Sequence, residues 1–319
     1  MNSHQTIEPI VLPMPALLGT VNAHLIRGPE GIALVDCGLN DASSLKDLRI
    51  ALEKRGLTFE DIDTVFLTHH HVDHAGAARF LQERGAQILM SSKDAALATD
   101  FYHRPELDEP RVMFSGRHGL PQEFTKSIQS IFSFLRHQGT FVKPDAIVSG
   151  GDTISLGGVP FETIATPGHT SGHLCLIQRD LGIAFTGDCV ISPRATHVSA
   201  STEDPPTDAF QEFIDSLELL STLTGVTPLS GHGAHIKALD VSAPRIIAHL
   251  ENELTSLESR LSDEPKSAFS LSRTVQKMRP RVFPQWLAVS QTVTYLLHLT
   301  LVGRAQCEET EAGFLYRRK

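Results

Sequence analysis

The chain has 319 residues, 41% of them hydrophobic, and a formal net charge of −9 at pH 7. This hydrophobic share is enough for a large core and excludes disorder as the state of the whole chain. The negative balance argues against a general nucleic-acid binder. Residues 266–319 are nevertheless basic, with a local charge of +6, which leaves −15 on the rest. We interpret this tail as a solvated helical surface; the alternative is a docking surface for a phosphate-bearing substrate or partner.

The first half of the chain predicts strands that alternate with helices, a pattern typical of an α/β fold. Short apolar runs predict buried strands over 31–36, 62–68 and 87–90. Leucines spaced three or four residues apart predict a helix over 41–55, and a second helix is expected over 75–84.

A helical insertion is predicted over about 95–143, because apolar residues recur at helical spacing between Ile128 and Leu135. It is either an extra layer packed on the sheet or a lid over a site, and one segment could do both. Three strands follow, over 159–165, 174–177 and 182–185, in a more antiparallel style.

After these strands the chain is predicted to turn helical. Helices are expected over 243–261, with Pro244 in its first turn, and over 271–278 and 286–304. The predicted organisation is therefore a metal-binding domain over 1–240 and a helical C-terminal cap over 241–319.

Nothing in the sequence predicts export or membrane insertion. Residues 1–15 lack the basic start and apolar core of a signal peptide, and no apolar run approaches the length of a membrane span. The four cysteines form no CxxC pair, and Cys37, Cys175 and Cys189 lie in apolar contexts typical of small buried residues. We expect a cytoplasmic protein that contacts no membrane.

Side chains able to bind metal gather just after the predicted strands. Segment 68–74 reads Thr-His-His-His-Val-Asp-His, and three further candidates lie far downstream in Gly-containing loops. The seven candidates are His69, His71, Asp73, His74, His169, Asp188 and His232. Imidazole and carboxylate together suit zinc, iron or manganese, and this number of groups can hold two ions.

The histidine-rich segment is costly to fold without a cation, because it crowds titratable groups together. A lone histidine is usually structural, but the same ligand types recur downstream in order, so that explanation does not suffice here. Of the neighbours, His70 is expected to face away from a metal, and His173 to make a structural hydrogen bond. Asp36 is expected to support a metal ligand rather than bind the metal itself. Surface or loop roles are expected for His24, His103, His118, His137, His197 and His235.

The motifs at 68–74, 166–173, 185–188 and 230–233 resemble the metal motifs of the metallo-β-lactamase-fold hydrolases. Val-Asp-Cys-Gly at 35–38 resembles an early strand-end signature of that superfamily, with Cys37 where Thr is more usual. The resemblance covers roughly 21–236. It implies a four-layer αββα sandwich, here with a helical insertion and a helical C-terminal extension. The extension resembles a winged-helix-like cap of the glyoxalase II-like and endoribonuclease-like bacterial branch.

By this resemblance the chain would bind two divalent metal ions, zinc in the first instance and iron or manganese as alternatives. The residues implied for the first ion are His69, His71 and His169. Those implied for the second are Asp73, His74 and His232. Asp188 would bridge the two beside a hydroxide, which attacks the substrate. The implied catalytic residues are Asp188 and Asp73, the latter to orient the nucleophile or pass a proton to the leaving group.

The expected activity is hydrolysis of a small ester-like substrate, a thioester or a lactone. The motifs of the glutathione-binding tail of glyoxalase II are not found, and neither is the long insertion typical of the RNA-processing branch. The alternatives are a phosphodiesterase or nuclease that uses the basic tail, a single-iron dioxygenase, and a metal-bearing sensor with little turnover. The expected partner is a small molecule; nucleic acid would bind only through the tail, and a homodimer is a further possibility.

Overall fold

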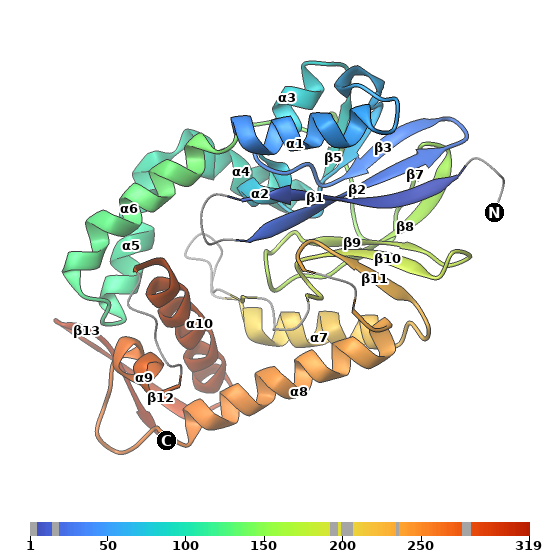
Figure 1. Cartoon of the computed structure of the whole chain (residues 1–319). Helices are drawn as coiled ribbons and strands as arrows, with labels where there is room; N and C mark the ends of the chain where they lie inside the picture. The colour runs from blue at the N-terminus through green and yellow to red at the C-terminus, as the bar shows by residue number, and fades with distance from the viewer. Residues whose placement is uncertain (1–4, 15–18, 192–196, 199–206, 234–235, 276–281) are drawn as a thin grey trace.

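The computed structural model describes residues 5–14, 19–191, 197–198, 207–233, 236–275 and 282–319. Two β-sheets face each other and helices cover both outer faces (Figure 1). The strands of the first sheet, in spatial order, are β1 (Thr6–Pro13), β2 (Thr20–Gly28), β3 (Gly31–Val35), β4 (Thr64–Phe66), β5 (Gln87–Met90) and β6 (Ala146–Ile147). Those of the second are β11 (Thr227–Ser230), β10 (Ile183–Gly187), β9 (Leu174–Gln178), β8 (Val159–Ala165) and β7 (Thr153–Leu156). The predicted four-layer αββα fold is confirmed.

The central strands are apolar on both faces because both faces are buried. In β3, Ala33 and Val35 pack between the two sheets, whereas Leu34 packs toward the helices on the outer face. In β9, Leu174 and Leu176 also lie between the sheets. Continuous apolar runs, rather than an alternation of polar and apolar residues, therefore mark the strands of this fold.

Helices α1 (Ala42–Glu53) and α3 (Ala78–Gln82) cover the outer face of the first sheet, and α7 (Ala209–Ser221) and α8 (Leu239–Glu258) lie outside the second (Figure 1). The helix predicted over 75–84 is instead two short helices, α2 (Val72–Ala75) and α3. They break at Gly76, where a Cβ atom would lie 2.3 Å from the carbonyl oxygen of Val72. Pro244 was expected in a first turn, but it lies inside α8, which begins at Leu239.

The predicted insertion is helical. It contains α4 (Ser92–His103), α5 (Asp108–Arg117) and α6 (Gln122–His137), with a short 3₁₀ turn at Pro105–Leu107. Arg136 of α6 joins the three helices: its guanidinium donates to both carboxylate oxygens of Asp108 at 2.8 Å and to the carbonyl of Phe101 at 2.6 Å. Both contacts to Asp108 come from Nη2, and hydrogen bonds between charged groups are stronger than neutral ones, so Arg136 gives the insertion an ordered interior of its own.

The C-terminal extension contains α9 (Ala268–Val275) and α10 (Val282–Leu301), and it ends in a β-hairpin of β12 (Ala305–Thr310) and β13 (Gly313–Arg318). The extension is helical as expected, but it ends in a hairpin that was not among the predicted elements. The hairpin is hard to recognise because most residues of β12 are exposed, so that strand lacks an apolar pattern. α10 lies beside the insertion helices in Figure 1, and the two segments pack in one hydrophobic cluster. None of the described helices has the length and apolar character needed to cross a membrane.

Candidate metal centre

The fold brings the candidate ligands together at one edge of the two sheets. β10 and β11 are parallel neighbours, so Asp188 and His232, which follow them, emerge at the same edge. The backbone of Gly231 donates to the carbonyl of Gly187 at 2.7 Å and ties these two ends together. The amide of Leu174 donates to Thr68 at 3.0 Å, which links the second sheet to the histidine-rich segment after β4.

The first group of ligand atoms consists of three imidazole nitrogens. His71 Nδ1 lies 3.1 Å from His69 Nε2 and 3.0 Å from His169 Nε2. Around a tetrahedral zinc ion bound at 2.0–2.1 Å, neighbouring ligand atoms are about 3.3 Å apart. The three nitrogens therefore have nearly the spacing of a metal-bound set.

The second group combines two imidazoles with a carboxylate. The Nε2 atoms of His74 and His232 are 3.2 Å apart. Asp73 Oδ2 lies 3.2 Å from His232 Nε2 and 3.8 Å from His74 Nε2. These three residues form a second set of atoms close enough to hold one ion.

Asp188 lies between the two groups. Its Oδ1 is 3.3 Å from His74 Nε2 and 3.5 Å from His232 Nε2. Its Oδ2 is 3.6 Å from His169 Nε2 in the first group. One carboxylate thus presents an oxygen to each group, which is the geometry that a bridging ligand requires.

Two of the histidines that face the centre are oriented by groups at the strand ends. His74 Nδ1 donates to Asp36 at 2.8 Å. The hydroxyl of Thr68 donates to Asp36, and it can therefore accept from His69 Nδ1, which lies 3.0 Å away. In both rings the other nitrogen, Nε2, points toward the centre.

The remaining two Nε2 ligands are oriented by backbone carbonyls. His169 Nδ1 donates to the carbonyl of His197 at 2.8 Å, and His232 Nδ1 donates to that of Thr20 at 2.7 Å. A carbonyl can only accept, so the proton must be on Nδ1 in both rings. Partners of this kind on the far nitrogen are typical of metal-binding histidines.

Burial keeps the first group of imidazoles neutral. It lowers the pKa of His69 and of His71 well below the usual range, and it lowers the pKa of His169 to about 4. A neutral imidazole is the form that binds a metal, so this group is ready to bind a cation without losing protons.

Asp73, in the second group, and Asp188, between the two groups, both remain charged carboxylates. Burial opposes the charged form of Asp188, but His74 and His232 overcome this and hold its pKa well below the usual range. Burial likewise lowers the pKa of His232, yet the neighbouring Asp188 raises it to about 10. These carboxylates thus attract positive charge to the centre, which a divalent cation can supply.

The residues around the centre leave no room for larger side chains. A Cβ atom on Gly231 would lie 2.5 Å from the His74 ring and 2.7 Å from Asp188 Oδ1. One on Gly187 would lie 2.6 Å from His173 Nε2. The glycines of the loop motifs are therefore required by the close approach of backbone to ligand. Donor set, spacing and packing together fit a site for divalent metal ions.

A family model described as the metallo-beta-lactamase superfamily matches residues 16–235. The chain belongs to this superfamily. The probable metallo-hydrolase YqjP of Bacillus subtilis is 22% identical over 302 residues, which is 90% of each chain. The hydroxyacylglutathione hydrolase GloC of Haemophilus influenzae is 30% identical over 180 residues, covering 55% of this chain and 70% of that protein. The chain is a metal-dependent hydrolase.

Solved structures of the superfamily extend the similarity to the whole chain. A metallo-beta-lactamase family protein of Thermus thermophilus has a TM-score of 0.85 at 25% identity and covers 98% of both chains. A beta-lactamase domain protein from Burkholderia ambifaria has a TM-score of 0.87 at 21% identity, covering 98% of this chain and 92% of that one. Because its identity is only 21%, the similarity to the Burkholderia protein shows the fold alone. Coverage this high includes the insertion and the C-terminal extension.

Asp36, in the early motif of the superfamily, supports the metal loop as predicted. Besides the imidazole of His74, its carboxylate accepts the backbone N–H of Thr68 at 2.9 Å. Its φ of 59° is left-handed, which is unfavourable for a residue other than glycine. Strain of this kind persists only where surrounding contacts enforce it, and here those contacts hold the loop.

A second buried carboxylate, that of Asp94, was not among the predicted site residues. It accepts hydrogen bonds from the backbone and ring of His70 and from the hydroxyl of Thr170, so it joins the two loops that supply the first group. Ser91 caps α4 by accepting from the Asp94 amide at 3.1 Å. A Ser-x-x-Asp pattern directly after the strand at 87–90 was the available signal.

Two of the other histidines differ from expectation, and His173 behaves as predicted. His24 and His118 are buried, with 4% and 1% exposed, rather than lying at the surface. His173 makes the structural hydrogen bonds that were predicted: its Nε2 accepts from the Asp188 amide at 3.3 Å, and its Nδ1 lies 2.7 Å from the hydroxyl of Thr166. His235 lies outside the described residues.

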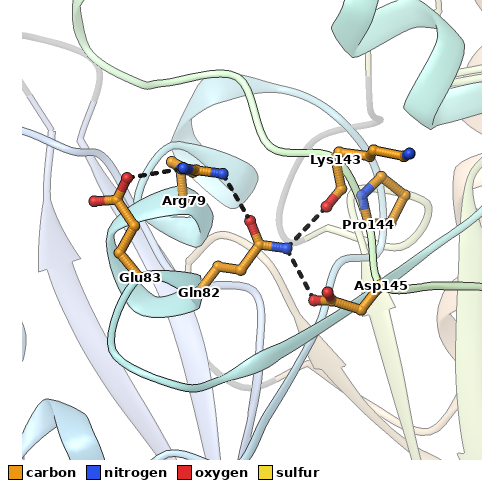
Figure 2. Close-up of a pocket in the computed structure, with 6 residues that line it drawn as sticks. All are labelled: Arg79, Gln82, Glu83, Lys143, Pro144 and Asp145. Atoms are coloured by element: carbon orange, nitrogen blue, oxygen red, sulfur yellow. Dashed lines mark hydrogen bonds and ion pairs between the residues drawn. The ribbon is translucent and has the colours of Figure 1, made fainter.

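A surface pocket of about 550 Å³ lies apart from these ligands (Figure 2). Its polar groups already bind one another. Gln82 donates to the carbonyl of Lys143 and to the carboxylate of Asp145, both at 2.9 Å, and Arg79 pairs with Glu83. The pocket is therefore a seam between α3 and the loop segment 143–145 that leads to β6, and it offers no reactive group.

Proposed function

We propose that this chain is a dinuclear metal-dependent hydrolase that cleaves a small ester-like substrate, a thioester or a lactone. The observation that carries the proposal is the position of Asp188, whose two carboxylate oxygens face two separate sets of ligand atoms. When bound there, two divalent cations, zinc in the first instance, supply an activated water and polarise the bond to be cleaved.

The residues of the chain divide the work of holding such a centre. His69, His71 and His169 hold one position. Asp73, His74 and His232 hold the other. Asp188 connects the two positions. In the four rings that present Nε2, the far nitrogen is already bonded, so each of these rings is held in one direction and loses little freedom when a ligand bond forms.

The second group of the centre is partly exposed. Asp73 and His232 each have 20% of their side chain exposed, whereas the side chain of His74 is fully buried. Asp73 is therefore within reach of a substrate. Its carboxylate is charged, since His74 and His232 outweigh burial and hold its pKa below the usual range. In this position the charged carboxylate can accept a hydrogen bond from the attacking water and orient it.

The substrate class rests on relatives and on charge. Relatives named hydroxyacylglutathione hydrolase act, by that name, on a thioester. Their similarity covers 55% and 65% of this chain, which supports the thioester class but not the glutathione part. The acidic balance of the chain outside its tail disfavours a long polyanion.

The test is metal removal followed by a substrate panel. Exhaustive chelation should abolish hydrolysis of a thioester or lactone, and zinc or manganese should restore it. Elemental analysis of the purified chain should find two metal ions. Hydrolysis that survives chelation would contradict the proposal.

The same panel separates the alternatives. A nuclease would cleave phosphodiesters and lose affinity steeply with salt, with log K linear in log salt. A single-iron dioxygenase would contain one iron and keep its activity in His74→Ala or His232→Ala. In the proposed enzyme either substitution removes a ligand of the second position, so the rate should fall with the metal content.

A further inference from the structure

The C-terminal helix α10 reaches the first group of the metal centre through a short backbone segment. This segment is His197–Val198, whose carbonyl at His197 accepts the Nδ1–H of His169 at 2.8 Å. Val198 is fully buried and packs in the same hydrophobic cluster as residues of α10. The partner that orients His169 therefore sits on a segment that α10 contacts directly.

Two side chains of α10 lie within hydrogen-bond distance of the backbone of Val198, one at its amide and one at its carbonyl. Gln291 Oε1 accepts the Val198 amide at 2.8 Å. The hydroxyl of Thr294 lies 3.1 Å from the Val198 carbonyl and equally far from that of Ser290 in its own helix, and its single proton is shared between them. Both side chains are buried, with 7% and 2% exposed. Hydrogen bonds in such a site are little weakened by competing water, so they restrain the segment strongly.

A second row of contacts fixes the orientation of the Gln291 amide. Its Nε2 donates to the hydroxyl of Tyr295 at 2.7 Å, and that hydroxyl donates to Glu253 at 2.8 Å. Because Nε2 faces an oxygen that already donates onward, Oε1 must face the Val198 amide. The chain of bonds thus runs from α8 through α10 to the metal ligand.

We propose that Gln291 and Thr294 are positioning residues for the metal ligand His169, acting through His197–Val198. The inference rests on the metal binding included in the proposed function. If the segment shifts, the carbonyl no longer holds the Nδ1 proton, and the ring loses both its tautomer and its direction. Losing such a partner typically weakens metal binding 10- to 100-fold. The C-terminal extension then helps to position a ligand of the first metal.

The experiment uses the full chain with Gln291→Leu and Thr294→Val, against the control Thr292→Val. Thr292 is matched to Thr294: it lies on the same helix, is 5% exposed, and donates to the carbonyl of Ala288 within α10. Zinc affinity is measured by competition with a chromogenic chelator. We expect one of two binding steps to weaken about tenfold in Gln291→Leu and Thr294→Val. Thr292→Val should match the wild type.

A second readout does not depend on a bound metal. In the metal-free chain, ¹⁵N NMR of His169 should show the Nδ1–H tautomer in the wild type and in Thr292→Val, and a mixture in the other two variants. Equal zinc affinities and equal tautomers in all three variants would overturn the inference. A wild type that binds zinc but hydrolyses no ester would contradict only the proposed function. A wild type that binds no zinc would contradict the proposed function. The tautomers of His169 would then decide whether Gln291 and Thr294 position this ring.

Discussion

At the scale of single residues, the metal centre depends on where each imidazole keeps its proton. His169 and His232 place it toward a backbone carbonyl, and His74 places it toward the carboxylate of Asp36. These bonds are made within the chain, so each of these rings is held in place by a partner of its own. Asp188 then supplies the negative charge that two neighbouring positions can share.

Replacement of the bridging carboxylate should affect both positions at once. In Asp188→Ala, metal content and hydrolysis should fall together, the rate by about 100-fold or more, as when one electrostatic group of a reaction centre is lost. The measurement is elemental analysis in parallel with steady-state kinetics.

The control is Asp180→Ala, an exposed position in the turn between β9 and β10, which should retain metal and rate. Full metal occupancy in Asp188→Ala would contradict the bridging role.

At the scale of elements, the insertion and the C-terminal hairpin meet at one histidine. His118, at the end of α5, stacks on Phe314, and its Nδ1 hydrogen-bonds to the hydroxyl of Tyr316 at 3.0 Å. The amide of Phe269, in α9, donates to the carbonyl of His118 at 3.1 Å. The imidazole is thus part of the apolar joint between two segments that are far apart in sequence.

This joint makes stability depend on pH. Burial, assisted by Arg117, lowers the pKa of His118 from 6.5 to about 4. The unfolded chain therefore binds this proton more readily, so the contribution of a neutral His118 is complete above pH 6.5 and is lost as the pH falls toward 4. The loss is at most about 3 kcal/mol in the free energy of unfolding.

The measurement is denaturant unfolding of wild type and His118→Phe between pH 7 and 4. The variant keeps the ring packing, and its profile should be flatter by up to that amount. His137→Phe, at an exposed position on α6, is the control and should follow the wild type. Parallel profiles for wild type and His118→Phe would refute the assignment.

At the scale of the whole molecule, one hydrophobic cluster joins the second sheet, the insertion and the C-terminal extension. It includes Ile128 and Phe132 of α6, Phe213 of α7 and Leu296 of α10. Trp286 of α10 stacks edge-on against Phe132, with ring centroids 5.3 Å apart. A core shared in this way couples the extension to the rest of the chain.

We therefore expect the metal-free chain to unfold in one transition. Trp286 is the single tryptophan of the chain and reports on the extension by fluorescence, whereas far-UV circular dichroism reports on all elements. The two denaturation curves should coincide, which is the test of two-state behaviour. A fluorescence transition at clearly lower denaturant would show that the extension unfolds by itself, as the predicted boundary at 240/241 implies.

Much of the fold could be predicted because its signals are local. The strand over 159–165 matches β8, and the helix over 41–55 contains α1, whose cap Asp41 accepts from the amides of Ser43 and Ser44. The break after Gly76 was missed, since it depends on a contact from elsewhere in the fold: the Ala77 amide donates to the carbonyl of Gly38 at 2.9 Å instead of continuing the helix. The hairpin after α10 was missed because β12 is mostly exposed.

By itself, the sequence determined the set of candidate ligands and their order, because loops after buried strands are recognisable from short patterns. Only the tertiary structure decided which ligands lie together in one group, and which residue hydrogen-bonds the far nitrogen of each ring that presents Nε2. His71 and His169 are 98 residues apart, and Gln291 reaches Val198 across 93 residues. Contacts of that span depend on how sheets and helices pack, and no local pattern of residues encodes them.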